Sequence, residues 1–449
     1  MRRSEASAPA VLAVAVLLAY FNALTGAFQF DDYNVIVQNP AVHSLAAWFD
    51  SMPGIRPLLK FSYALNWTLH SGPFGFHLFN VVVHAINAVL VYQLLRALIE
   101  QRTEAHWGPF AGALLFALHP VQTEAVTYIS GRSVCLMALF YLCSVLTWLR
   151  AEQQAHPAPW RALSAGLFGA ALLVKETAVT LPFALLLLDA LGSRRRFTMG
   201  QMLQRQAWHW LVLGGSVVVI AASPTYRNLL EVSLAARGML ENLLTQTNAV
   251  CYLAVQLIAP WRLNVDPDLP VLSAFTPALS LQAAAIIALM ALGLCNLRRR
   301  AWLAFAILWI FLQLLPTNSL LPRLDVANDR QLYLALIGVA CAFGMGVQAV
   351  MQHENRRWLA GAITGMVVIG LGVTTVQRNQ AYASAVAFWE DAALKSPAKP
   401  RVANNLGYAY QQAGQIEAAK LAYQHAIELD PDYWKARINL DVLESAQRR

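Results

Sequence analysis

The chain has 449 residues, of which 57% are hydrophobic and only 13% charged, and it carries a formal net charge of +8. This composition excludes an ordinary soluble domain and predicts an integral membrane protein in contact with the lipid bilayer. The basic residues are distributed over separate loops, which argues against nucleic acid as a partner. The five cysteines lie in apolar runs without CxxC or CxxxH spacing, so neither disulfides nor a zinc site is expected.

Apolar runs with the length of a membrane helix recur along the chain. A tilted helix needs roughly 17 to 25 residues to span a bilayer. Runs that approach this length lie near residues 8–28, 76–97, 108–128, 133–150, 160–174, 177–192, 207–223, 278–297, 301–316, 331–350 and 357–377. A shorter candidate at 246–260 is either re-entrant or lies along the surface. The sequence therefore predicts an all-α, polytopic membrane helix bundle of about 11 to 12 spans.

The positions of arginine in the short loops predict the orientation of this bundle. One group of loops is expected in the cytoplasm and contains Arg2, Arg3, Arg102, Arg161, the runs 194–196 and 298–300, and the pair Arg356 and Arg357. The extracytoplasmic side then holds residues 29–75, 129–132, 175–176, 224–277, 317–330 and the C-terminal tail. We interpret the first span as an uncleaved anchor, because no small-residue cleavage site follows it cleanly.

Two adjacent carboxylates, Asp31 and Asp32, follow the first span in the stretch FDDYN. One interpretation is that this charged pair only ends the span and faces water. The loop behind the pair, residues 33–75, is long for a connector, and its aromatic side chains are suited to the membrane interface. The pair is therefore a candidate site at the edge of the membrane.

Polar side chains recur along the second apolar run. His77, Asn80, His84 and Asn87 follow one another at spacings of three, four and three, so they share one face of a helix. Such a face is expected to look into the bundle rather than at lipid. Hydrogen bonding between helices is the simpler interpretation for the two asparagines, and the spacing does not favour metal ligation by the histidines.

Charged side chains also stand next to later apolar runs at the same predicted membrane face. They are Glu124 and Arg132 in LHPVQTEAVTYISGR, Lys175 and Glu176 in LLVKETAV, and Asp329 and Arg330 in VANDRQLYLAL. A charge at the bilayer centre costs on the order of 2.5 to 3.5 kcal/mol, so groups this close to the core are candidates for function. Two structural alternatives stay open: snorkelling of Lys175 and Arg132 to the interface, and an internal pair of Lys175 with Glu176.

The chain changes character beyond residue 380, where alanine, glutamine, lysine and tyrosine follow a helical period. A repeat of 34 residues counted from Pro400 has small and aromatic side chains at the tetratricopeptide positions. These residues are Leu406, Gly407, Tyr410, Ala419, Tyr423, Ala426 and Pro431. We therefore predict a membrane domain over 1–379 and a tetratricopeptide module over 380–449, with one full repeat at 400–433 and partial repeats on either side. Because such units need about three copies for stability, the module is expected to lean on the membrane domain or on a partner.

Several motifs in order resemble a known family. They are FDDYNVIVQNP, RPLLKFSYALNW, GFHLFNVVVHAINAVLVYQLL, LFALHPVQTEAVTYISGR, LLVKETAVTLP and DRQLYL, followed by the repeat tail. Together they resemble the transmembrane and tetratricopeptide-repeat O-mannosyltransferase-like proteins, and the resemblance extends over almost the whole chain. This family belongs to the C-type glycosyltransferases, which are membrane enzymes that use polyprenyl-phosphate sugars and carry an acidic motif in the first extracytoplasmic loop.

The resemblance implies a fold of the C-type glycosyltransferase kind, with Asp31 and Asp32 as the acidic motif and a protein as acceptor. The chain departs from the family pattern at three places. Relatives commonly have an acid where this chain has Val134, and the second histidine of the HPxHTE stretch is replaced by Gln122. The repeat tail is also shorter than in many relatives, so the choice of donor or acceptor is expected to differ.

The chemistry of sugar transfer assigns roles to these residues. The acceptor hydroxyl loses a proton as it attacks the anomeric carbon, and the leaving lipid phosphate gains charge. We expect Asp31 to be the base and Asp32 to orient the acceptor or a cation. Cationic side chains stabilise the leaving phosphate in a partly desolvated site, and the candidates in falling order are Arg330, Lys175, Arg132 and Arg56. The candidates for binding sugar or acceptor are Glu124, Glu176 and His84.

Two other functions and several properties stay open on the sequence. A non-catalytic membrane scaffold or assembly factor that displays the repeat module is the main alternative, in which the acidic pair has no chemical role. A transporter would need charges near the midplane and broken helices in two matching halves, which the sequence does not show clearly. No cofactor is predicted, although paired acids are able to hold Mg²⁺ or Mn²⁺. A bacterial inner membrane is the expected location, with the endoplasmic reticulum as the alternative.

Overall fold

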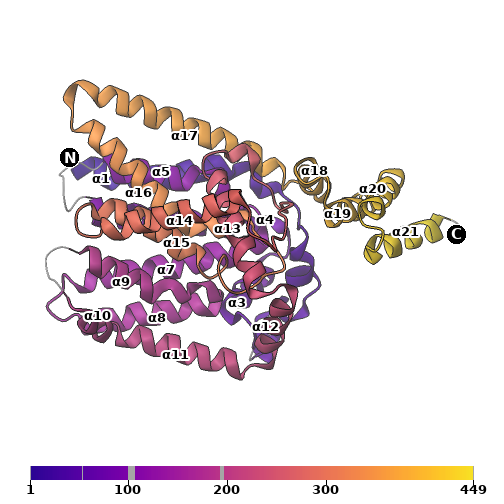
Figure 1. Cartoon of the computed structure of the whole chain (residues 1–449), viewed down its shortest axis with the longest axis horizontal. Coiled ribbons are helices and arrows are strands. Elements are labelled where there is room, and N and C mark those ends of the chain that lie inside the picture. The colour runs from indigo at the N-terminus through magenta and orange to yellow at the C-terminus, as the bar shows by residue number, and fades with distance from the viewer. Residues whose placement is uncertain (1, 53, 100–106, 193–196, 448–449) are drawn as a thin grey trace.

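A computed structural model describes residues 2–52, 54–99, 107–192 and 197–447. All regular elements in these ranges are helical, which confirms the predicted all-α class. Two groups of arginines used to predict the orientation, Arg102 and the run 194–196, lie outside the described residues. Figure 1 shows a bundle of long, roughly parallel helices, with a smaller helical module projecting from the end opposite the N-terminus.

The bundle is built from helices of very different length. In chain order they are α1 (Arg2–Tyr20), α2 (Leu45–Asp50), α3 (Pro57–Leu69), α4 (Pro73–Ile99), α5 (Trp107–Leu118), α6 (Thr123–Val126), α7 (Arg132–Ala151), α8 (Ala158–Val174), α9 (Leu181–Leu191), α10 (Met199–Arg205), α11 (Ala207–Ala222), α12 (Pro224–Ala236), α13 (Met239–Gln256), α14 (Pro277–Cys295), α15 (Ala301–Leu314), α16 (Leu332–Met351) and α17 (Arg357–Gln380). Each apolar run in the sequence forms one of the longer helices, or a helix with the turns that adjoin it.

Six of these helices within the described ranges are long and apolar enough to cross a membrane, and a seventh arises if α11 and α12 form one broken span. The two halves of that pair meet at an angle of 82°. The apolar helices α5, α8 and α15 are shorter. Residues 246–260 form the second half of α13 and the turn after it. The total of about 11 to 12 spans therefore stays a prediction.

Small residues let the central helices approach closely. A Cβ atom on Gly108 of α5 would lie 2.6 Å from the backbone oxygen of Gly344 on α16, and one on Gly112 would lie 2.5 Å from that of Ala340. Close packing through small residues is typical of membrane helices, because lipid offers no hydrophobic force that drives them together. Larger side chains at these positions would push α5 and α16 apart.

The polar face of α4 lies inside the bundle, as its spacing predicts. The Asn80 side chain donates to the backbone oxygens of Val126 and Ile129, at 3.2 and 3.3 Å. Asn87 donates to the Cys135 carbonyl at 2.8 Å. These contacts connect α4 to α7 and to the turn before it, so the asparagines have the structural role that the simpler interpretation gave them.

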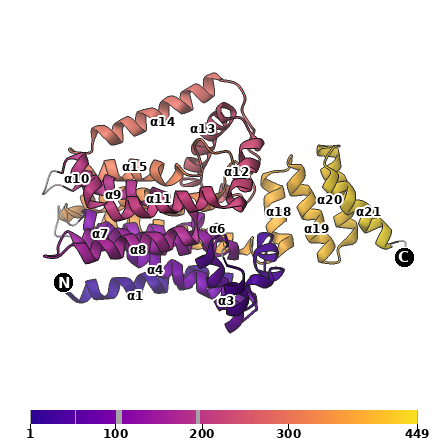
Figure 2. The same ribbon diagram turned by 90° about the horizontal axis from the view of Figure 1, so that it is seen from below.

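The connecting segments gather at the two ends of the bundle in the groups that the sequence predicts. Residues 29–75, 119–131, 175–180, 224–277 and 315–331 meet at the end that carries the module. Contacts between them include the ion pair of Arg56 with Glu176 and a hydrogen bond from Asn242 to the Ser319 carbonyl. Figure 2 shows this end from another side and shows α14 standing away from the rest of the bundle. We call it the module end.

The module consists of α18 (Ala385–Lys395), α19 (Pro400–Gln412), α20 (Ile416–Leu429) and α21 (Trp434–Gln447). A Cβ atom on Gly407 would lie 2.6 Å from the ring of Tyr423, so the glycine lets α19 and α20 close on each other. Gly414, in the turn between them, has a φ of +75°, which only glycine adopts readily. These contacts explain why small residues recur in the repeat.

The module packs directly on the bundle. Tyr128, from the turn before α7, lies in one apolar cluster with Tyr382, Phe388 and Trp389 at the start of the module. Arg378, in the last turn of α17, forms an ion pair with Asp391 of α18. The module therefore leans on the membrane domain, as its small number of repeats requires.

Candidate functional site

The two carboxylates of the FDDYN stretch have different surroundings. Asp32 is fully buried, and its oxygens accept hydrogen bonds from the backbone N–H groups of Gln29 and Ser130, both at 2.8 Å, and from the Ser130 hydroxyl. Burial raises the pKa of Asp32 to about 7, although these hydrogen bonds oppose the shift. Asp32 thus fastens the first loop to the turn before α7.

Asp31 is held by its backbone and leaves its carboxylate free. Its N–H donates to the Tyr128 hydroxyl at 3.0 Å, and the side chain is only partly buried. Among the described residues, no hydrogen bond or ion pair reaches the Asp31 carboxylate. A fixed backbone with an unpartnered carboxylate is what a general base requires, because the oxygen must accept a proton from a substrate.

Asp31 lines a hollow between the bundle and the module, which we call the module-side hollow. Its walls combine both parts of the chain: Phe30, Asp31, Glu124, Tyr128, Val265, Asp266, Asp325, Asn328, Arg330, Phe388, Trp389 and Arg401. The Phe30 and Trp389 rings meet edge to face at 5.3 Å. The module therefore forms one wall of the space that Asp31 faces.

A second hollow, which we call the basic hollow, adjoins the first. It is lined by Val134, Met137, Lys175, Thr177, Gln313, Thr317, Arg323, Asn328, Arg330, Gln331 and Leu334. Three cations and no carboxylate are among these residues. Such a set attracts an anionic group, and the apolar side chains on the α7 and α16 walls suit a lipid.

Arg330 and Asn328 belong to both hollows and form the wall between them. The backbone N–H of Arg330 donates to Glu124 at 3.0 Å, and its Nε lies 3.4 Å from the other carboxylate oxygen of Glu124. Asn328 is buried, yet within the described residues neither its side-chain oxygen nor its nitrogen has a partner. A buried amide without partners costs free energy unless a ligand supplies them.

Lys175 and Arg323 are poorly neutralised. In the described ranges, the single hydrogen bond of the Lys175 ammonium runs to the Ser133 hydroxyl at 3.5 Å, and none is found for the Arg323 guanidinium. Loss of water, then the neighbouring cations Arg330 and Arg56, lower the pKa of Lys175 well below its usual value. An anion bound here would relieve that repulsion, so the hollow is prepared for negative charge.

Arg56 and Glu176 form an ion pair with each other, so neither side chain is free for a separate contact with substrate. Arg56 Nε lies 3.0 Å from both carboxylate oxygens, and the Tyr226 hydroxyl donates to Oε1 of Glu176 at 2.9 Å. Burial alone would raise the pKa of Glu176, but Arg56 lowers it overall. This contact replaces the internal pair of Lys175 with Glu176 that the sequence left open, and it leaves Lys175 unpaired.

Arg132 is the candidate whose position differs most from expectation. Its side chain is fully buried and donates to Asn80 at 2.8 Å, to the Ser62 carbonyl at 3.1 Å and to the Phe76 carbonyl at 3.0 Å, with the Phe79 ring 4.2 Å away. It neither snorkels nor lines either hollow. Arg132 therefore connects α3, α4 and α7, and its predicted contact with a donor phosphate is not supported by this position.

His84 likewise lies in the helix packing. One ring nitrogen is 2.7 Å from the Tyr333 hydroxyl and the other is 3.1 Å from the Ala117 carbonyl. Both nitrogens are thus occupied, and His84 lines neither hollow. A contact with sugar or acceptor is not supported, because the residue is sealed between α4, α5 and α16.

The structure brings together Asp31, Glu124, Lys175 and Arg330, which were predicted from the sequence, and adds residues that were missed. The additions are Arg323, Asn328, Gln331, Asp325, Asp266 and Arg401. A weak signal existed for Arg323, because it lies in the loop 317–330, which also contains Arg330 and was predicted to be extracytoplasmic. The arrangement can accept a proton in one hollow and hold an anion in the next.

Comparison with known proteins gives consistent results. The family profile of dolichyl-phosphate-mannose-protein mannosyltransferases matches residues 53–226, and that of the tetratricopeptide repeat matches residues 400–433. The protein O-mannosyl-transferase TMTC3 of Mus musculus is 24% identical over 96% of this chain and 52% of its own length. TMTC4 of the same species is 26% identical over 91% of this chain and 64% of its own length.

A solved structure, the apo oligosaccharyltransferase of Archaeoglobus fulgidus, is similar at 12% identity with a TM-score of 0.49, over 83% of this chain and 56% of that chain. The sequence relatives confirm the resemblance to the transmembrane and tetratricopeptide-repeat O-mannosyltransferase-like proteins that the motifs predicted. This chain spans about half the length of the curated relatives it matches.

Proposed function

We propose that this chain is a membrane glycosyltransferase that moves a sugar from a polyprenyl-phosphate donor to a protein Ser or Thr hydroxyl. The observation that carries the proposal is the free Asp31 carboxylate in one hollow and the unneutralised Lys175 and Arg323 in the next, with Arg330 in the wall between them. The similarity to named protein O-mannosyl-transferases favours a mannose-like hexose.

The proposed reaction is a single displacement. Asp31 accepts the proton of the acceptor hydroxyl as its oxygen attacks the anomeric carbon from the module-side hollow. The new glycosidic bond forms while the bond from the anomeric carbon to the phosphate oxygen breaks, so the configuration inverts. The electron pair of the broken bond stays on the lipid phosphate, whose charge is stabilised by Lys175, Arg323 and Arg330.

The sugar would lie at the wall between the hollows. Asn328 presents an unpartnered amide there, and Gln331, on the basic side, also has no partner for its side-chain oxygen or nitrogen within the described residues. Amides both donate and accept, as sugar hydroxyls do. Glu124 adds a carboxylate in the module-side hollow. The polyprenyl tail would extend from the phosphate toward lipid along the apolar side chains of the basic hollow, which include Val134 and Leu334.

We also propose that the transfer proceeds without a metal ion. The support is the use of Asp32, because both of its oxygens already accept hydrogen bonds from Gln29 and Ser130. Asp32 would act by positioning Asp31 rather than by touching the acceptor. The acidic pair therefore offers one free carboxylate, rather than two that could hold Mg²⁺ or Mn²⁺ together.

The module would recruit the protein acceptor on the extracytoplasmic face, since it forms a wall of the hollow that contains Asp31. We place the chain in a bacterial inner membrane. In the alternative function, a membrane-anchored scaffold, the module binds the same protein partner but the chain catalyses no reaction. The two proposals differ only in whether Asp31 is needed for a covalent change in that partner.

Intact-mass spectrometry of extracytoplasmic proteins tests this proposal, in cells with wild type, Asp31→Asn or Arg330→Ala at equal membrane levels. Asp50→Asn is the matched control, because Asp50 is an exposed acid in the same loop. Loss of a hexose mass in the first two variants and not in the control would support transfer. Unchanged masses in every strain, with a protein still captured by the module, would replace the enzyme with the scaffold.

A further inference from the structure

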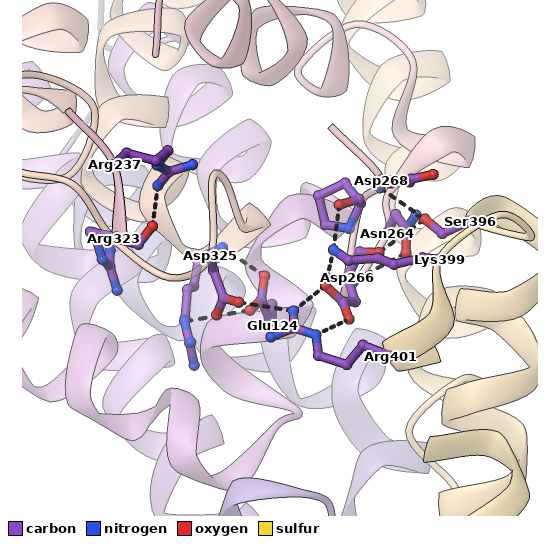
Figure 3. A network of polar contacts seen from close by, with 12 residues as sticks. Glu124, Arg237, Asn264, Asp266, Asp268, Arg323, Asp325, Ser396, Lys399 and Arg401 are labelled. Carbon is purple, nitrogen blue, oxygen red and sulfur yellow. Dashed lines mark hydrogen bonds and ion pairs between the residues drawn. The ribbon is translucent and has the colours of Figure 1, made fainter. Parts of the chain in front are cut away.

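Arg401, at the start of α19, joins the module to two separate loops of the membrane domain. Its guanidinium forms an ion pair with Asp266 and donates to it through Nε at 2.8 Å, and it donates to Asp325 at 2.8 Å. Figure 3 shows the side chain extending from the module ribbon between the two carboxylates. Asp266 lies in the segment between α13 and α14, whereas Asp325 lies in the segment between α15 and α16.

The second of these segments, residues 315–328, carries a cation of the basic hollow and leads into another. Arg323 lies two residues before Asp325, and Arg330 follows the segment directly. Burial alone would raise the pKa of Asp325, but Arg401, then Arg330 and Arg323, lower it overall. Asp325 therefore lies among the arginine of the module and the two arginines of the basic hollow.

Apolar packing holds this segment at its end, where Val326 and Ala327 join the core, but its middle is exposed. Leu320, Leu321 and Leu324 are 55%, 51% and 73% exposed. The exposed middle of the segment is held by polar contacts: on one side Asn242 donates to the Ser319 carbonyl at 2.8 Å and Arg237 donates to the Arg323 carbonyl, while Gln246 donates to the Val326 carbonyl at 3.2 Å. On the opposite side, toward the module, the contact from Arg401 to Asp325 holds it (Figure 3).

We infer that Arg401 of the module is a positioning residue for the donor-phosphate site, which it sets through Asp325 and the 315–328 segment. The inference rests on the proposed function for the identity of the anion. It adds a second role for the module, since α19 would shape the basic hollow even when no acceptor is bound. A planar guanidinium can serve two carboxylates at once, which a lysine ammonium does less well.

Lys399 provides a matched control within the same network. Its ammonium forms an ion pair with Asp266 at 2.6 Å and donates to the Pro267 carbonyl at 2.8 Å. It has no contact with Asp325 among the described residues. Lys399 and Arg401 therefore both fasten the module to the α13–α14 segment, but only Arg401 also reaches the segment that carries Arg323.

The test uses full-length protein in nanodiscs and two measurements. The first is binding of radiolabelled polyprenyl-phosphate mannose, and the second is hydrogen–deuterium exchange of residues 315–328. Arg401→Met and Asp325→Asn should each weaken donor binding about tenfold and speed exchange in this segment. The double variant should bind no more weakly than either single variant, because both remove one contact. Lys399→Met should stay within about twofold of wild type.

Unchanged binding and unchanged exchange in Arg401→Met would overturn the inference, as would equal effects of Lys399→Met. If Arg401→Met does not fold, Asp325→Asn decides, since it leaves the contacts of the module with Asp266 in place. Failure of wild type to bind the donor would instead count against the proposed function. In that case the exchange comparison still decides whether Arg401 positions the segment.

Discussion

Arg330 is joined to Glu124 twice, through a backbone hydrogen bond of 3.0 Å and through Nε at 3.4 Å from the second carboxylate oxygen. The carboxylate thus holds the inner edge of the guanidinium. Arg330 also lines both hollows, so this contact holds it at the wall between them.

Asp31→Asn should abolish transfer and spare donor binding. An amide of the same shape cannot accept the proton, and loss of a general base typically lowers rates about 10²- to 10⁴-fold. Transfer to extracytoplasmic proteins and binding of the labelled donor are measured on the same preparations, with Asp50→Asn as control. A variant that loses binding as much as transfer would show that Asp31 acts on the donor instead.

Asp32→Ala should lower stability more than Asp31→Ala. The substitution leaves the buried N–H groups of Gln29 and Ser130 unpaired, which costs about 1–3 kcal/mol for such a group. Thermal unfolding in detergent gives the comparison. Equal melting temperatures for the two variants would contradict the structural role.

The difference between wild type and Asp32→Ala should also depend on pH. Burial raises the pKa of Asp32 to about 7. The folded protein therefore keeps the Asp32 proton up to about pH 7, whereas the unfolded chain has already lost it at lower pH. The stabilising contribution is complete below the unfolded pKa and is lost as the pH rises through about 7. We therefore expect a larger difference in melting temperature at about pH 5 than at about pH 8. A constant difference would show that Asp32 does not titrate in this range.

Donor binding should weaken as the pH rises, because Lys175 loses its proton earlier than an ordinary lysine. Its pKa is lowered by loss of water and by the neighbouring arginines, so the ammonium that pairs with phosphate is present only below that value. Lys175→Arg keeps the charge and should remove the pH dependence. The measurement is donor affinity over a series of pH values for wild type and Lys175→Arg. If the affinity of both falls in the same way with pH, the titrating group is not Lys175.

Arg132→Met and Arg323→Met should impair different properties, folding in the first variant and donor binding in the second. Arg132 is buried among backbone carbonyls of α3 and α4, so its loss should lower the yield of folded protein. Arg323 lines the basic hollow, and its loss should weaken donor binding about tenfold with normal yield. Arg298→Met, at the exposed far end of the bundle, serves as control. Weak donor binding by well-folded Arg132→Met would restore the role that the sequence predicted.

Asn328→Leu should show whether Asn328 binds the sugar or the phosphate of the donor. The buried amide has no partner among the described residues, so a sugar hydroxyl is its expected partner. The variant should lose affinity for polyprenyl-phosphate mannose and keep its affinity for polyprenyl phosphate without sugar. Equal losses for both ligands would place Asn328 at the phosphate.

The sequence was sufficient to predict the helical bundle and the repeat module, and it indicated several residues of the candidate site. Asp31, Lys175 and Arg330 were recognised because charges beside apolar runs are rare and costly. The inward face of α4 was recognised because polar residues at helical spacing are equally unusual within a span. In each case the signal is a contrast between one residue and its immediate surroundings.

The remaining features depend on contacts between distant segments. Arg323 and Arg401 lie outside the long apolar runs, where an arginine is common, so their roles emerge only when the 315–328 segment and α19 meet. For Arg132, the local sequence signal points to a role that its contacts do not support. Its sequence neighbours mark it as a site candidate, but the carbonyl groups of Ser62 and Phe76 that satisfy it come from other helices.

The connection between α17 and α18 is short. Only residues 381–384 separate the last long helix from the module, and four residues span at most about 14 Å. The ion pair of Arg378 with Asp391 and the apolar cluster of Tyr128, Tyr382 and Phe388 hold the module beside Asp31. We therefore expect a fixed spacing in the acceptor: the hydroxyls that receive sugar should lie a constant number of residues from the segment that the module binds.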